Sequence, residues 1–322
     1  MRATRLSPIA LMVVGAGCSG PQSALDPAGP AAQSLHTLGI VMYAGATAVT
    51  LLVALLMLWP FVRPRERPAN RQIFLWGGGV LLPSVTLLAL IPYAMMAGSQ
   101  MRAPDTRLSV DVTGFVYWWE MSYRQPDGTR VTTANELRLP VGEPVELLLR
   151  SDDVIHGFWV PALAGKTDVI PGRVNRMVIE ASQTGVFRGQ CAEFCGAQHA
   201  MMAFDVIVVS RAEFDAWLQR HAKPVTRPRA GDLRAGHDLF LSAGCGSCHA
   251  VRGISIGQLG PDLTNVGARL SLAAGAFPNN IGTLAGWIVA SQHLKPGNRM
   301  PNFSNLQGQE LRALAGWLES LK

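Results

Sequence analysis

The sequence predicts a multidomain membrane protein with a two-helix transmembrane hairpin, an all-β domain and an all-α C-terminal domain. Two long uncharged apolar runs predict the hairpin, and strand-like segments after them predict the β domain. Helical segments around a Cys-x-x-Cys-His motif predict the last domain. The 322 residues allow two or three domains, and 48% apolar with only 16% charged residues is typical of a membrane protein.

The first 17 residues resemble an export signal, with a basic start and a short apolar run that ends in small residues. Cys18 follows Gly15, Ala16 and Gly17, which resembles a bacterial lipoprotein cleavage site, although a leucine is usual where Gly15 stands. We therefore expect lipidation of Cys18 and a lipid anchor. Ordinary signal cleavage or an inert cysteine is the alternative. Residues 18–100 then hold an extended N-terminal segment and the hairpin.

The hairpin helices are expected at about residues 38–62 and 73–98. Neither run contains a charged residue, and each exceeds the length of about 20 residues that spans a bilayer core. The loop between them, RPRERPANR, has four arginines and one glutamate, so the positive-inside rule places it in the cytoplasm. Everything after residue 98 then lies on the outer side. A buried helical hairpin of a soluble protein is the alternative.

The net charge of +6 comes largely from arginines beside the membrane segments and in a later linker. No basic run is interleaved with aromatic residues, so we expect no nucleic-acid partner.

Residues 101–220 are predicted to form a β-sandwich or barrel. The strand-like stretches are VDVTGFVYWWEMSY, EPVELLLRS, RVNRMVIEA and MAFDVIVVS, with turn signals between them. His156 is expected in a loop after one strand, and the segment CAEFCGAQHAMM between two others. A rigid β scaffold that carries such loops at one end suits a metal site.

The segment CAEFCGAQHAMM concentrates side chains that bind metals. With the upstream histidine, the candidate ligands are His156, Cys191, Glu193, Cys195, His199 and Met202. Two thiolates, two imidazoles and a thioether suit copper. A mononuclear electron-transfer copper needs one cysteine, so the second thiolate indicates two coppers that share bridging sulfurs. A disulfide between the cysteines and a structural zinc are the alternatives.

The segment CGSCH carries the attachment signature of a c-type haem. Cys245 and Cys248 are the expected covalent attachment points, and His249 is the expected iron ligand. A thioredoxin-like dithiol is the alternative. Met300, which alone among the methionines follows Met202, is the candidate sixth ligand, because Met/His ligation suits electron transfer. His293 or an open iron position is the alternative.

Residues 221–230 form a Pro/Arg-rich linker, and residues 231–322 form the haem domain. The last segment, GQELRALAGWLESLK, has apolar residues at helical spacing. We expect it to pack against the first helix of this domain, with Gly236 and Phe240 near Trp317.

The order of these features resembles subunit II of a bacterial haem–copper cytochrome c oxidase with a fused C-terminal cytochrome c domain, the caa type. The hairpin, an aromatic strand, His156, GKTDVIPGR, CAEFCGAQHAMM and CGSCH carry the resemblance, which covers essentially the whole chain. It implies a cupredoxin-like β domain, a class I cytochrome c domain and a dinuclear copper centre held by the six ligands above. Glu193 would bind copper through its backbone carbonyl.

The resemblance also implies contacts with subunit I. The Glu193 carboxylate would share a magnesium ion with that subunit, and Asp168 and Arg173 match positions near the same contact; for these two, an ordinary surface role is the alternative. Pro261, in LGPDL, matches the residue whose carbonyl holds the ring of the haem-ligating histidine, here His249. A plain loop proline is the alternative.

The implied function is an electron relay in the bacterial inner membrane, with both cofactor domains on the periplasmic side. A periplasmic cytochrome c or similar donor would reduce haem c, and the electron would pass through copper to subunit I, which reduces O2 to water and couples this to proton translocation. Subunit III is a further expected partner. The remaining histidines are scattered, so we expect no catalytic residue here. The alternatives are a relay that feeds a nitric oxide reductase, or a free-standing redox or copper-delivery protein.

The chain departs from the family pattern in two places. The aromatic run through which electrons enter the copper usually begins with tryptophan, whereas here Tyr117 leads and Trp118 and Trp119 follow. One of these rings is a candidate entry point, and a plain role in the sandwich core is the alternative. Relatives also have a carboxylate near the start of the second helix, and this chain has none between Glu66 and Asp105.

Overall fold

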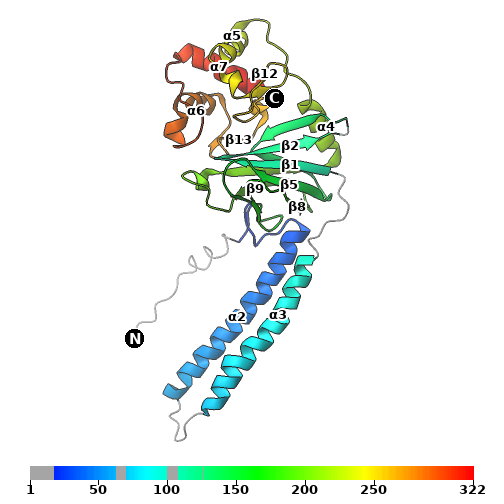
Figure 1. Cartoon of the computed structure of the whole chain (residues 1–322), viewed down its shortest axis with the longest axis vertical. Helices are drawn as coiled ribbons and strands as arrows, with labels where there is room; N and C mark the ends of the chain where they lie inside the picture. Colours follow the sequence, from blue (N-terminus) through cyan, green and yellow to red (C-terminus); the bar gives the residue numbers. More distant parts are fainter. Residues whose placement is uncertain (1–17, 63–69, 100–107, 126) are drawn as a thin grey trace, which may run out of the picture.

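The computed structural model describes residues 18–62, 70–99, 108–125 and 127–322. The chain forms three parts along one long axis, with a helical hairpin at one end, a β-sandwich in the middle and a small helical domain at the other end (Figure 1). The expected export signal, residues 1–17, lies outside the described residues. Cys18 is exposed, as a lipid-modified residue would need to be.

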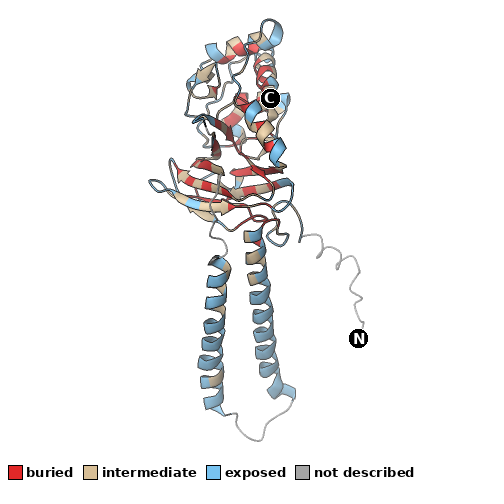
Figure 2. Ribbon diagram, turned by 90° about the vertical axis from the view of Figure 1, so that its right-hand side faces the viewer, coloured by how far each residue is buried: buried red, intermediate tan, exposed pale blue. Residues whose placement is uncertain are grey.

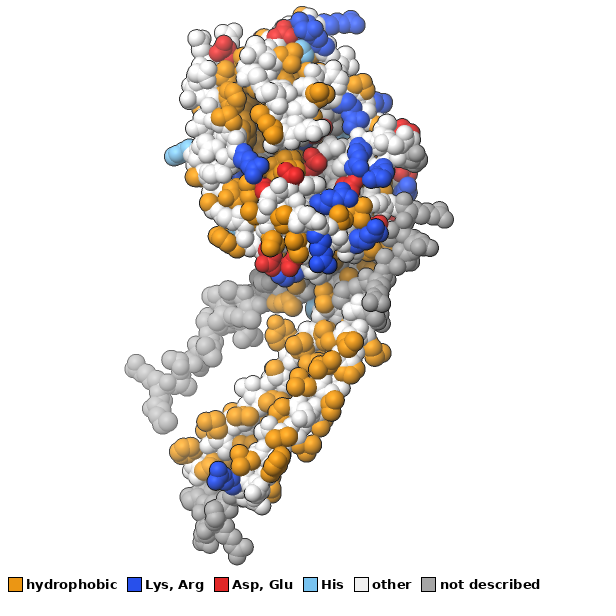
Figure 3. Space-filling model, in the orientation of Figure 1, with side chains coloured by type: hydrophobic (Ala, Val, Ile, Leu, Met, Phe, Trp, Pro, Cys, Tyr) orange, Lys and Arg blue, Asp and Glu red, His pale blue; other side chains and the backbone are white. Residues whose placement is uncertain are grey.

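The hairpin consists of α2 (Pro30–Val62), the π-helical η1 (Ile73–Leu81) and α3 (Leu82–Ser99). Its two apolar windows have mean hydropathies of 2.2 and 2.0, and none of their residues is buried within the chain. Figures 2 and 3 show the result, two helices whose exposed surface is almost entirely hydrophobic. Such a surface is stable only in a lipid environment, so the chain is membrane-anchored.

The first helix begins at Pro30, not near Leu38, and the residues around its start contact the β domain. Proline favours the first helical position because its missing N–H has no helical acceptor there. Residues 28–32 lie on the β domain, where the Ala28 N–H donates to the Ala162 carbonyl at 2.6 Å. A Cβ at Gly29 would stand 2.3 Å from the Glu180 carbonyl oxygen, so only glycine permits this approach. The base of the hairpin is thereby tied to the sandwich.

Within the described residues of the middle domain, ten strands form two five-stranded sheets, which confirms the cupredoxin-like sandwich. The first sheet has the order β3-β2-β1-β5-β8 and the second the order β4-β10-β9-β6-β7. The strands are β1 (Leu108–Phe115), β2 (Trp118–Arg124), β3 (Arg130–Ala134), β4 (Glu136–Pro140), β5 (Val145–Ser151), β6 (His156–Trp159), β7 (Thr167–Val169), β8 (Asn175–Ile179), β9 (Gly185–Cys191) and β10 (Ala203–Val209).

Strand alternation places one face of each sheet in a shared core. In β5 every second residue is buried, which is the period expected of a strand with one covered face. The largest core contacts are aromatic, with Phe158 stacked on Phe204 at 4.7 Å between ring centroids and Trp119 edge-on to both. After β10, α4 (Arg211–His221) closes the domain, and its Trp217 packs edge-on against Tyr123.

The C-terminal domain is built on α5 (Gly231–Ser242), α6 (Ile281–Leu294) and α7 (Gly308–Ser320). Short elements lie between α5 and α6, namely η3 (Cys245–Ser247), β11 (Ala250–Val251), β12 (Ser255–Ile256), η4 (Val266–Ala268), β13 (Ser271–Leu272) and β14 (Phe277–Pro278). Helix α5 crosses α7 closely, because a Cβ at Gly236 would stand 2.1 Å from the Ala313 carbonyl oxygen. Phe240 packs on Trp317 with ring centroids 5.0 Å apart, so the expected contact of Gly236 and Phe240 with Trp317 is confirmed.

The C-terminal domain is docked on the sandwich through its segment 270–275. The Leu270 N–H donates to Glu136 Oε1 at 2.5 Å, and the Ser271 hydroxyl donates to Asp205 Oδ2 at 2.8 Å. The Ala203 N–H, at the start of β10, donates to the carbonyl of Ala274 at 3.0 Å. The two domains therefore share backbone and side-chain hydrogen bonds near the start of β10.

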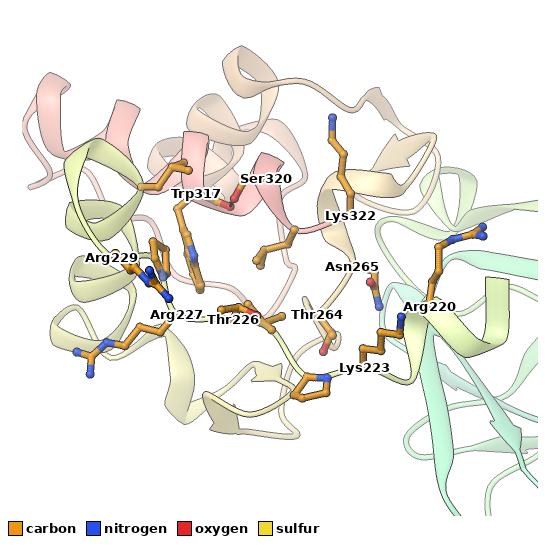
Figure 4. Close-up of a pocket in the computed structure, with 15 residues that line it drawn as sticks. Arg220, Lys223, Thr226, Arg227, Arg229, Thr264, Asn265, Trp317, Ser320 and Lys322 are labelled. Atoms are coloured by element: carbon orange, nitrogen blue, oxygen red, sulfur yellow. Dashed lines mark hydrogen bonds between the residues drawn. The ribbon is translucent and has the colours of Figure 1, made fainter. Parts of the chain in front are cut away.

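The linker lines a pocket of about 650 Å³ between the sandwich and α7 (Figure 4). Its wall carries the cations Arg220, Lys223, Arg227, Arg229 and Lys322 around an apolar floor that includes Trp317 and Leu321. Arg227 pairs with Asp238 at 3.3 Å. Part of the positive charge of the chain therefore lies at this junction.

Candidate metal centres

Strand pairing brings the two halves of the copper motif together. His156 opens β6 and Cys191 closes β9, and these strands are antiparallel neighbours with Phe158 opposite Cys191. Strand β10 pairs with the other edge of β9 and begins just after Met202. The loop from Cys191 to Met202 therefore folds back over the end of the sheet at which His156 lies.

All six candidate donors gather around two sulfur atoms. Cys191 Sγ lies 3.7 Å from Cys195 Sγ. The remaining distances to these sulfurs are 3.8 Å from His156 Nδ1 to Cys191, 3.2 Å from the Glu193 carbonyl oxygen to Cys191, 3.7 Å from His199 Nδ1 to Cys195 and 3.8 Å from Met202 Sδ to Cys195. The site is shielded from water, because His156, both cysteines and Met202 are all less than one-tenth exposed.

This donor set fits copper better than the alternatives. Both cysteines are free thiols, so they do not form a disulfide. A structural zinc takes four ligands, whereas four further donors surround the two sulfurs and make six in all, with each imidazole next to a different sulfur. The two cysteines are hydrogen-bonded to each other, and this contact holds the pKa of Cys191 well below its usual range and raises the pKa of Cys195. A bound cation would compensate the charge of two thiolates at this distance.

The residues around the ligands fix their orientation. His156 Nε2 lies 2.9 Å from Asp153 Oδ1, which leaves Nδ1 free to face Cys191. The other Asp153 oxygen accepts the Val116 N–H at 2.7 Å. The sequence interpretation missed Asp153, although its position three residues before His156 was an available signal, because a ligating histidine commonly donates its second N–H to a carboxylate.

The aromatic run places its three rings in different surroundings. Trp119 is fully buried, lies 5.7 Å from the His156 ring and directs Nε1 at the Met202 carbonyl, 3.5 Å away. The Tyr117 hydroxyl accepts the Ala197 N–H at 3.1 Å, within the copper loop. Trp118 is half-buried and stacks on Phe115 with ring centroids 4.5 Å apart. Trp119 and Tyr117 thus contact the copper segment, and Trp118 points elsewhere.

The side chain of Glu193 faces outward, away from its own carbonyl. Its carboxylate pairs with Lys166, and the same ammonium lies 3.6 Å from Asp168 Oδ1. Both carboxylate side chains are more than one-third exposed, and Arg173 is also exposed. Lys166, Asp168 and Glu193 therefore form a charged surface at the loop from Cys191 to Met202.

The haem motif lies where α5 ends. Cys245 opens η3 and Cys248 follows it, so one tight turn presents both thiols next to His249. His249 Nδ1 donates to the Pro261 carbonyl at 2.8 Å, as the motif LGPDL indicated, and Nε2 remains as the donor for iron. A Cβ at Gly260 would stand 2.5 Å from the His249 ring, so glycine is needed for the ring to lie there.

The two candidates for the sixth haem ligand differ in environment. Met300 is half-buried against the apolar core of the C-terminal domain, and its carbonyl accepts from Ser291 and Gln292 at 2.8 and 2.7 Å. His293 is exposed on α6. The packing therefore favours Met300.

Comparison with known proteins agrees with this division of the chain. Residues 109–210 match the family model for the periplasmic domain of cytochrome c oxidase subunit II, and residues 233–322 match the family model for cytochrome c. The first family implies a copper centre and the second a covalently bound haem.

Relatives extend the match to the whole chain. Cytochrome c oxidase subunit 2 of Alkalihalophilus pseudofirmus is 34% identical over 99% of this chain and 97% of its own length, and that of Bacillus subtilis is 32% identical over 69% and 64%. The crystal structure of the periplasmic domain of cytochrome oxidase subunit II from Bradyrhizobium japonicum is 32% identical, covers 37% of this chain and 96% of its own, and has a TM-score of 0.35. The chain belongs to the cytochrome c oxidase subunit 2 family and, with its cytochrome c domain, is a membrane-anchored subunit of an oxidoreductase.

Proposed function

We propose that this subunit relays single electrons from a periplasmic donor through haem c and a dinuclear copper centre to the catalytic subunit, where O2 is reduced to water. The observation that carries the proposal is the contact between the two candidate metal loops. Gln198, beside His199, donates from Nε2 to the carbonyl of Pro296 at 3.0 Å, and Met300 follows in the same loop. Two redox sites that touch through their ligand loops can exchange electrons within one chain.

The copper site is proposed to use His156, Cys191, the Glu193 carbonyl, Cys195, His199 and Met202. When bound, two coppers that share thiolates supply a one-electron carrier. The chain contributes a dry, shaped cavity, and Asp153 orients His156 so that Nδ1 faces the sulfurs. A preformed ligand set of this kind limits rearrangement when the charge of the site changes.

The haem site is proposed to use Cys245 and Cys248 for attachment and His249 and Met300 as iron ligands. Donation from His249 Nδ1 to Pro261 fixes the tautomer and makes Nε2 the ligand atom. The loop that carries Met300 is braced by the hydrogen bonds of Ser291 and Gln292, so the thioether position is set by α6. With a thioether and an imidazole as its iron ligands, the haem would have a raised reduction potential.

We further propose that the charged surface formed by Lys166, Asp168 and Glu193 faces subunit I. Its carboxylates, together with groups of that subunit, would hold a magnesium ion, with Arg173 close by. Carboxylate oxygens are the ligands that magnesium prefers, and Lys166 occupies this position in the isolated chain. The arginine-rich sequence of the loop between the helices supports a location of the anchored domains on the periplasmic side of the bacterial inner membrane. We also propose that subunit III is a partner and that the partner subunits couple the reaction to proton translocation. Cys18 is proposed to carry a lipid.

The experiment is metal analysis and electron paramagnetic resonance of the complex purified from membranes. Two coppers per haem c in this subunit and a mixed-valence signal that is lost in Cys191→Ser would support the relay. Co-purification with a large haem-a-containing subunit would distinguish an oxidase from a nitric oxide reductase or a free-standing carrier. Zinc in place of copper would refute the proposal.

A further inference from the structure

Lys295 is a buried lysine at the contact between the two cofactor domains. It directly follows α6, precedes Met300 in the same loop and is only 2% exposed. Lysine is almost never fully buried unless its charge is compensated. The Lys295 ammonium therefore requires hydrogen-bond acceptors in the interior.

The Lys295 ammonium is bound by three backbone carbonyls. Nζ donates to Met201 at 2.7 Å, to Tyr117 at 2.9 Å and to Ala273 at 2.9 Å. An ammonium has three N–H donors, so all three are used. Ala273 belongs to the haem domain, whereas Tyr117 and Met201 belong to the sandwich. Met201 lies between the copper-loop residues Met202 and Ala200, one residue from a proposed copper ligand.

No carboxylate among the described residues forms an ion pair with Lys295. Burial therefore lowers the pKa of the ammonium to about 7. A buried charge of this kind is retained only where every donor is matched, because an unmatched one is strongly destabilising. The three carbonyls converge from segments far apart in the sequence, which makes this a built binding site for one side chain.

Weaker contacts flank Lys295 along the same seam. Gln198 donates to the Pro296 carbonyl at 3.0 Å, and Arg299 lies 3.4 Å from Asp153, the residue that orients His156. Arg299 is well exposed although Asp153 is not, so solvent screens this pair in part. Among these contacts, the Lys295 ammonium is the buried group that joins the Cys191–Met202 loop to the loop that carries Met300.

We propose that Lys295 is a positioning residue that fastens the haem-ligand loop to the copper loop and keeps the domains docked for electron transfer. This inference rests on the proposed relay function. In the step it serves, one electron leaves ferrous haem c, which becomes ferric, and the oxidised copper pair is reduced by one electron. Lys295 neither donates nor accepts an electron in that step.

The test uses the assembled oxidase with haem c and copper in place and the variant Lys295→Met. Haem c is photoreduced, and its reoxidation by copper is followed by absorbance. We expect the intramolecular rate to fall at least about tenfold, because three buried carbonyls lose their donor and the docked population decreases. The rate should also become sensitive to solvent viscosity, since docking then precedes transfer. Lys223→Met, at an exposed linker position, is the matched control and should behave as wild type.

A second readout does not depend on electron transfer. Limited proteolysis of linker residues 222–230 should be faster in Lys295→Met than in wild type, while the haem absorbance and the copper resonance spectrum stay unchanged. Wild-type rates and proteolysis in Lys295→Met would overturn the role of Lys295. So would a slower rate that is accompanied by altered haem or copper spectra, because the change would then lie at a metal site.

Different experimental results would refute the relay function and the positioning role of Lys295. If haem c of the wild-type complex does not pass electrons to copper, the relay itself is refuted. If Lys295→Met prevents assembly, Lys295→Gln, which retains an amide donor, replaces it and should give an intermediate rate. A wild-type rate in Lys295→Gln would overturn the proposal.

Discussion

The carboxylate of Asp153 lies 2.9 Å from His156 Nε2 and thereby turns the opposite ring nitrogen towards the Cys191 thiol. The same carboxylate accepts the Val116 N–H at 2.7 Å, so it is itself held in place. A ligand histidine without such a partner can rotate or change tautomer, and its basicity falls.

We expect Asp153→Ala to weaken copper binding about 10- to 100-fold, since partners of this kind have effects of that size. The measurement is a competition titration of copper against a chelator. Asp152→Ala is the control, because Asp152 is the adjacent residue and is exposed. Equal copper affinities for the two variants would show that the Asp153 contact does not orient the ligand.

The environments of Met300 and His293 predict different outcomes when each residue is substituted. Met300→Leu keeps the size and apolarity of the side chain and removes the thioether. We expect the haem to lose the absorbance band of methionine ligation and its reduction potential to drop by a sizeable part of the roughly 0.8 V range that axial ligands span. His293→Ala should leave both unchanged, because His293 is exposed. A potential that responds to His293→Ala and not to Met300→Leu would reverse the assignment.

The sequence predicts the metal ligands well because the chemistry confines them to short motifs. Two thiols and a histidine must lie within five residues to hold a c-type haem, and four of the copper side-chain donors lie between Cys191 and Met202. The contacts of Lys295 could not be predicted in this way, because Met201 is 94 residues distant and Tyr117 is 178 residues distant in sequence. Only the docking of the domains brings these groups together.

In the hairpin and the sandwich, too, the sequence pattern predicts only part of the structure. Hydropathy locates the membrane-embedded part of α2 but misses its first turns, because residues 30–37 are helical with a mixed polar and apolar composition. Strand alternation identifies long strands such as β5, whereas β6 and β7, with four and three residues, are too short for the pattern to appear. Both short strands nevertheless place His156 at the metal site.

Burial of His221 predicts acid sensitivity of the sandwich. Desolvation, with nearby Arg138, Arg220 and Arg269, lowers the pKa of His221 from 6.5 to about 4, and Nε2 accepts the Trp217 indole N–H at 3.0 Å. The unfolded chain binds more protons than the folded one between these two pKa values. Stability is therefore complete above pH 6.5 and decreases as the pH falls towards about 4, by about 3 kcal/mol in all.

His221→Gln keeps a side-chain acceptor and removes this titration. Hydrogen exchange of the strand amides, measured in both chains between pH 6.5 and about 4, should show a shallower loss of stability in the variant. If the stability of both chains fell equally with pH, His221 would have an ordinary pKa in the folded chain.

The crossing of α5 and α7 predicts opposite effects for two glycine-to-alanine substitutions. A methyl group at Gly236 would stand 2.1 Å from the Ala313 carbonyl oxygen and 2.8 Å from Trp317 Cβ, so the helices must separate. We expect Gly236→Ala to destabilise the haem domain by about 1–3 kcal/mol, the usual range for overpacking. A methyl group at Gly316 on α7 would meet no neighbouring atom within 4 Å, so Gly316→Ala should stabilise the helix by up to about 1 kcal/mol. Thermal unfolding followed at the haem absorbance measures both, and a loss of stability in Gly316→Ala equal to that in Gly236→Ala would show that the close crossing is not what constrains this helix pair.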